Sequence, residues 1–114
     1  MQLTKEYEPD LLIVTVTEDR LDAAAAVAFK DAMKAATRDA PRRVILDLGQ
    51  VTFLDSSGLG AIVAVMKQLA PARQLEVAAL HPNVMRVFRL TRMDSVIPVH
   101  PGRPRRNQDL PKVS

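Results

Sequence analysis

The residues with the clearest capacity for chemistry are two adjacent serines, Ser56 and Ser57, which follow Asp55 and precede Gly58. Asp and Ser side chains accept hydrogen bonds from the unpaired amides of a first helical turn, so this group is typical of a helix N-cap. Two hydroxyls followed by a glycine exceed what a cap requires. Gly58 and Gly60 each cost a helix about 1 kcal/mol relative to alanine. We therefore expect something to approach this backbone closely.

The serines lack the surroundings of a catalytic nucleophile. A Gly-x-Ser-x-Gly elbow needs a glycine two residues before the serine, but Leu54 and Asp55 occupy those positions. His81 and His100 are each followed by a proline and belong to no motif that would make either one a general base, so we expect capping or loop roles for them. The chain has no cysteine, phosphate-binding loop or His-Glu-x-x-His motif. We expect no enzyme activity, no cofactor and no metal site.

The net charge of +3 comes from one end of the chain. Residues 1–100 carry twelve of the sixteen Lys and Arg residues and twelve of the thirteen Asp and Glu residues, so this part is neutral. The other four basic residues are Arg103, Arg105, Arg106 and Lys112. Together with three prolines, they predict a domain over residues 1–100 and a basic, proline-rich, disordered tail over residues 101–114. Because no aromatic residue is interleaved with them, they favour a solvated tail over a nucleic-acid partner.

The N-terminal residues and the composition point to one compartment. A chain of 114 residues is about the size of one domain. Residues 1–10 already contain four charged side chains, unlike a secretion signal, and no apolar run approaches the roughly 20 residues that span a bilayer. The lack of cysteine fits a reducing environment. These features predict a cytoplasmic protein without a membrane partner.

Apolar runs alternate with helical patterns along residues 1–100. We expect strands at residues 2–8, 11–16, 44–48, 75–80 and 96–99. We expect helices at residues 22–37, at residues 56–69 and from Pro82 onward. The order ββαβαβαβ predicts a single α/β domain, with a mostly parallel sheet of four to five strands packed by three to four helices. Ser57 then stands at the junction between a buried strand and a helix.

This junction resembles the signature of a known family. Asp55-Ser56-Ser57-Gly58-Leu59-Gly60, preceded by the strand ending at Asp47-Leu48 and by Val51-Thr52-Phe53-Leu54, is similar to the motif of STAS domains, specifically the bacterial anti-sigma factor antagonists. Weaker matches are Arg20-Leu21-Asp22 and the run Val87-Phe88-Arg89-Leu90-Thr91 that leads to residues 96–99. The resemblance covers about residues 5–100.

The resemblance implies a switch protein. Such family members bind an anti-sigma factor that is also a serine kinase, which frees a sigma factor, and they are inactivated when that kinase phosphorylates the second serine of the motif. That serine corresponds to Ser57, and a PP2C-type phosphatase reverses the modification. Asp22, Asp55, Ser56 and Gly58 fall at positions that lie at or beside the kinase-binding surface in the family. We expect a monomer or weak dimer.

A phosphate on Ser57 would act on a partner and leave the fold intact. It adds a charge of about −1.5 to −2, which the amides and dipole of a helix N-terminus favour. A partner packed closely over this surface would meet repulsion and a desolvation cost. A loss of about 2–4 kcal/mol weakens binding roughly 30- to 1000-fold, which is enough for a switch.

Two departures and one alternative accompany the resemblance. The family commonly has glycine where this chain has Arg92, and many members end with a helix that residues 101–114 are unsuited to form. STAS domains also serve as scaffold subunits of signalling assemblies or as small components of lipid-transport complexes. Those relatives often lack a phosphorylatable serine at the second position, so Ser57 favours the switch.

Overall fold

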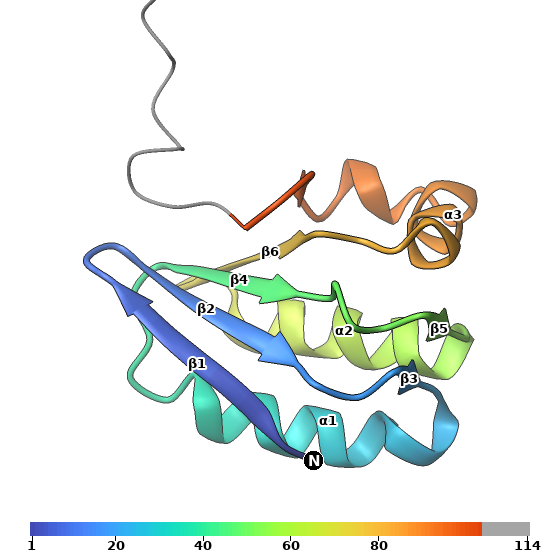
Figure 1. Ribbon diagram of the computed structural model, residues 1–114. Coiled ribbons are helices and arrows are strands. Elements are labelled where there is room, and N and C mark those ends of the chain that lie inside the picture. The colour runs from blue at the N-terminus through green and yellow to red at the C-terminus, as the bar shows by residue number, and fades with distance from the viewer. Residues whose placement is uncertain (104–114) are drawn as a thin grey trace, which may run out of the picture.

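The main sheet has five strands in the order β1-β2-β4-β6-β7, in a computed structural model that describes residues 1–103 (Figure 1). β1 (Leu3–Glu8) runs antiparallel to β2 (Leu11–Val16), and β4 (Arg43–Asp47), β6 (Gln74–Ala78) and β7 (Val99–His100) follow in parallel. Over the described residues there are three α-helices, which are α1 (Ala23–Ala36), α2 (Ser56–Leu69) and α3 (Pro82–Leu90). A 3-10 turn, η1 (Met93–Ser95), precedes β7. The predicted α/β domain with a mostly parallel sheet is confirmed.

Strand β2 is buried on both faces, as its continuous apolar run predicted. Alternate residues of a strand point to opposite sides of the sheet. Leu12 and Val14 belong to the main core, whereas Leu11 and Ile13 belong to a separate buried cluster with Ile45 and Ala78. The sheet therefore has a large apolar core on one face and a smaller apolar patch on the other.

The helices cover the face with the large core. Figure 1 shows α1 and α2 side by side along the sheet, and the two helices are in contact. Phe29 and Met33 of α1, Ile62 of α2 and Phe88 of α3 are fully buried in the same cluster. Because one core joins all three helices to the sheet, the helix ends are held in fixed positions.

Two of the expected strands are shorter in the structure. β6 ends at Ala78, because Ala79 has a φ of 61° and interrupts the extended backbone. β7 begins at Val99, not at residue 96, because Val96 is still in the turn that closes η1 and Pro98 has no N–H to donate. Ile97 is fully buried in the core, which accounts for the apolar character of the run.

Arg92 follows α3 in a left-handed conformation, with φ 60° and ψ 20°. Glycine adopts this conformation most readily, and the left-handed region costs other residues about 1–2 kcal/mol. The residue at which this chain departs from the family pattern therefore lies in a turn with a positive φ.

The other face of the sheet carries a buried ion-pair network around Glu76. This side chain is 3% exposed and accepts hydrogen bonds from Arg43 Nε at 3.0 Å and Nη2 at 2.9 Å. Its Oε1 also lies 2.6 Å from Nε2 of His100. Burial raises the pKa of Glu76, but the hydrogen bonds and charges of Arg43 and His100 outweigh burial and lower that pKa below its ordinary value. The network joins β4, β6 and β7.

Arg103 lies across the same face. Its guanidinium is 2.9 Å from a carboxylate oxygen of Glu6 and 2.9 Å from one of Asp47. Glu6 is opposite Ile13 in the sheet, and Asp47 is opposite Thr15, so the guanidinium spans β2. The rest of the predicted tail, residues 104–114, lies outside the described residues, so its disorder and the boundary at residue 100 stay predictions.

Candidate functional site

Two short strands that the sequence analysis did not predict bring the two helix starts together. β3 (Arg20–Leu21) and β5 (Phe53–Leu54) form a separate parallel pair. Backbone hydrogen bonds from Thr52 N to Asp19 O at 2.8 Å and from Asp55 N to Leu21 O at 3.4 Å extend the pairing. Figure 1 shows β3 and β5 at the end of the molecule where α1 and α2 begin. Two residues are too few for an apolar periodicity, so no sequence pattern marked these strands.

An aspartate caps each of these helices. Asp22 is the N-cap of α1, and its Oδ1 accepts a hydrogen bond from Ala25 N at 3.2 Å. Asp55 is the N-cap of α2, and its Oδ1 accepts from Gly58 N at 2.8 Å. The N-cap expected at Asp55 is confirmed, and because Asp22 follows β3 as Asp55 follows β5, the two caps sit at neighbouring junctions.

Ser56 and Ser57 are the first two residues of α2, and both are exposed. Within residues 1–103 neither hydroxyl forms a hydrogen bond, since Asp55 fills the capping role. The serine side chains are thus accessible at a helix N-terminus, where the free amides and the helix dipole favour an added anion.

Gly58 is buried because the chain itself covers it. A Cβ at this position would lie 2.0 Å from the carbonyl oxygen of Leu21 and 2.9 Å from Cδ1 of Leu54. The close approach expected from the glycines is therefore internal packing at Gly58. At Gly60 no part of the described chain makes such an approach, because an added Cβ would have no neighbour within 4 Å, so a close approach there stays a prediction. Direct contact of Gly58 with a partner stays a prediction.

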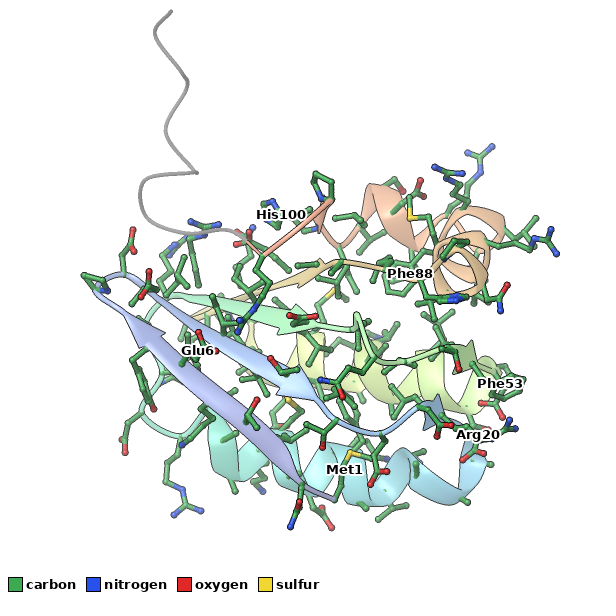
Figure 2. The ribbon with its side chains drawn as sticks, viewed as in Figure 1. Met1, Glu6, Arg20, Phe53, Phe88 and His100 are labelled. Carbon is green, nitrogen blue, oxygen red and sulfur yellow. The ribbon has the colours of Figure 1, made fainter. Side chains whose placement is uncertain are left out.

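A stacked pair of side chains lies on the exposed side of the β3-β5 pair. The guanidinium carbon of Arg20 is 4.1 Å from the centre of the Phe53 ring, and Arg20 Nε is 3.3 Å from Oδ2 of Asp22. Phe53 is 38% exposed. Figure 2 shows the Arg20 and Phe53 side chains next to each other. No sequence pattern marked this pair, because its members are 33 residues apart and meet only through the β3-β5 register.

The two histidines have structural partners. His81 caps α3, with its Nδ1 accepting from Asn83 N at 3.1 Å, and Asn83 in turn donates to Thr52 O at 3.4 Å. His100 is bound to Glu76 on the far face of the sheet. The described part of the chain contains no group of three or more His, Cys, Asp or Glu residues that could hold a metal ion. The capping role expected for a histidine is confirmed at His81.

The fold and the site together define a small α/β domain with an exposed serine pair at the N-terminus of a helix, beside a second capped helix. The model of the STAS domain family matches residues 2–104. The chain belongs to the STAS domain family, and it is of the anti-sigma factor antagonist type.

Individual relatives agree with this assignment. BtrV of Bordetella bronchiseptica, described as an anti-sigma factor antagonist, is 30% identical over 100 residues, which are 87% of this chain and 85% of BtrV. The crystal structure of an anti-sigma factor antagonist from Mycobacterium paratuberculosis has a TM-score of 0.77 at 29% identity and covers 88% of this chain and 85% of that one. The Bacillus protein SpoIIAA in its phosphorylated form shares the fold, with a TM-score of 0.61 at 20% identity over 86% of this chain and 90% of its own.

Among residues 1–103, no helix combines the length and the apolar character needed to cross a membrane.

Proposed function

We propose that this chain is a cytoplasmic anti-sigma factor antagonist that binds a serine kinase anti-sigma factor and is inactivated by phosphorylation of Ser57. The observation that carries the proposal is the exposed Ser57 hydroxyl in the first turn of α2, which no described residue engages. The anti-sigma factor antagonist relatives at 29% and 30% identity support the general role. Asp22, Asp55, Ser56 and Ser57 form the proposed partner surface, and the buried Gly58 is the proposed partner-binding residue beneath it.

The local packing supports a switch that acts on the surface and not on the fold. Gly58 is pressed against the carbonyl of Leu21, so the start of α2 has no room to move toward β3. Asp55 already caps the helix. A phosphate on Ser57 would interact favourably with the backbone amides and the dipole of the helix N-terminus. The added charge would therefore remain at the surface, where a bound partner would have to desolvate it.

The charge of the neighbouring residues would increase the effect. Asp55 places a carboxylate directly before the serines, and Asp22 caps the neighbouring helix α1. A dianion added next to them would repel any acidic group that the partner brings to this surface. A loss of about 2–4 kcal/mol corresponds to a roughly 30- to 1000-fold weaker complex.

The proposal is tested by phosphorylation with the cognate kinase and ATP, with the modified residue mapped by mass spectrometry. We expect one phosphate, on Ser57, and its removal by a PP2C-type phosphatase. Ser56→Ala keeps the Ser57 hydroxyl and should still carry its phosphate on Ser57, whereas Ser57→Ala should not be modified. An unmodified wild type, or equal modification of Ser57→Ala, would contradict the mechanism and favour a scaffold role without phosphorylation.

A further inference from the structure

The stacked pair of Arg20 and Phe53 has the features of a binding anchor. It does not belong to the partner surface proposed above. The two residues face each other across the β3-β5 pair, while Leu21 and Leu54 point into the core. The ring of Phe53 and the carboxylate of Asp22 hold the Arg20 guanidinium from two sides. The flexible arginine side chain is therefore already ordered before any partner arrives.

Stability alone gives little reason for this arrangement. The Arg20 side chain is 56% exposed, and exposed ion pairs add little to the free energy of folding. Phe53 stays more than one-third exposed, although apolar residues of this size are usually buried. Arginines and aromatic residues dominate the energetically important positions of protein interfaces, where ordering before binding reduces the entropy loss.

The open side of Arg20 indicates what it would bind. Asp22 accepts a hydrogen bond from Nε of Arg20. Within the described residues, neither terminal nitrogen of Arg20, Nη1 or Nη2, has a partner. A guanidinium with two free donors in one plane matches the geometry of a carboxylate. The exposed part of the neighbouring Phe53 would accept an apolar side chain.

We propose that Arg20 and Phe53 form an anchor that receives an acidic side chain and an adjacent apolar side chain of the partner. This inference rests on the proposed function, because the partner is the kinase that recognises the Ser57 surface. The anchor adds attraction beside Asp22 and Asp55, so it fixes the orientation in which the partner approaches the serines. Phosphorylation of Ser57 would then act on a complex that Arg20 has aligned.

The test is titration calorimetry of the full-length unphosphorylated chain with the cognate kinase. Arg20→Ala should raise Kd at least 30-fold, and Arg20→Lys about 10-fold, because lysine keeps the charge but offers no planar fork. Phe53→Leu should raise Kd about 10-fold by removing the ring while keeping an apolar side chain. Arg38→Ala is the matched control, since Arg38 is an exposed arginine just beyond the opposite end of α1, and its Kd should stay within about threefold of wild type.

The same experiment includes Ser57→Asp, so that failure of the anchor and failure of the proposed function look different. If Ser57→Asp abolishes binding while Arg20→Ala and Phe53→Leu bind like the wild type, the anchor is wrong and the switch stands. If Ser57→Asp and the anchor variants all bind like the wild type, both are wrong. If the anchor variants weaken binding while Ser57→Asp binds like the wild type, the anchor stands and the switch is wrong. Circular dichroism confirms that each variant is folded.

Discussion

The carbonyl oxygen of Leu21 lies where a side chain on Gly58 would begin, since an added Cβ would be 2.0 Å away from it. Leu21 is fully buried and pairs with Leu54 across β3 and β5. The first turn of α2 is therefore pressed against β3 with no intervening side chain. This contact sets where the two serines emerge at the surface.

Gly58→Ala should destabilise the domain by about 2–3 kcal/mol, because the methyl group overlaps backbone that has no space to move. Alanine favours a helix by about 1 kcal/mol relative to glycine. The expected loss of about 2–3 kcal/mol is the net effect, after this gain has been subtracted from the cost of the overlap. Urea unfolding of both variants measures the effect. Gly60→Ala is the matched control in the same helix. It should stabilise the domain by up to about 1 kcal/mol, because nothing lies near its added methyl group.

Ser57→Asp should leave the melting temperature within a few degrees of the wild type. The residue is exposed in the first turn of α2, where a negative charge interacts favourably with the helix dipole. Binding of the kinase should fall roughly 30- to 1000-fold at the same time. Thermal unfolding and calorimetry measure the two properties separately. An unfolded variant would show that Ser57 supports the fold and is not a surface switch.

The network around Glu76 predicts how stability depends on acid. The pKa of Glu76 is lower in the folded chain than in the unfolded chain, where it is about 4.3. The folded state therefore binds fewer protons, and this contribution to stability is present above about pH 5 and is lost as the pH falls through the folded pKa. Glu76→Gln should lose about 1–3 kcal/mol at pH 7, because Arg43 then loses a charged partner. The difference from wild type should shrink below about pH 4, and a constant difference across the whole range would contradict this account.

Arg92→Gly should stabilise the domain by up to about 1 kcal/mol. Glycine relieves the left-handed strain at φ 60° but has more freedom in the unfolded chain, so the net gain is less than the strain itself. The melting temperature should rise by several degrees. Arg92→Ala keeps a Cβ in the same conformation and should give no such rise, which separates relief of backbone strain from loss of the arginine charge.

Arg103→Ala should destabilise the domain by about 1 kcal/mol, because the guanidinium lies between the carboxylates of Glu6 and Asp47. A double-mutant cycle with Asp47→Asn measures the coupling, which should decrease at high salt. Arg105→Ala provides a control of the same residue type from the tail. Additive effects of Arg103→Ala and Asp47→Asn would show that the ion pair adds nothing to stability.

Local patterns determined much of the fold and the centre of the site. The continuous apolar run of residues 11–16 predicted a strand covered on both faces, because only such a strand can bury every side chain. The Asp55-Ser56-Ser57-Gly58 sequence predicted a helix start, because those side chains bind amides within three residues of themselves. The start of α2 at Ser56 and the Asp55 cap follow from these neighbours in the chain.

Tertiary structure decided the features that depend on distant segments. The β3-β5 pair, the stacking of Arg20 on Phe53 and the burial of Gly58 under Leu21 each join residues more than 30 positions apart. Glu76 in β6 is likewise bound by Arg43 and His100, which come from two other strands. By itself, the sequence determined that a serine pair opens a helix after a buried strand. Only the fold decided which side chains surround that pair, because a local preference extends over a few residues whereas packing depends on how all the elements fit together.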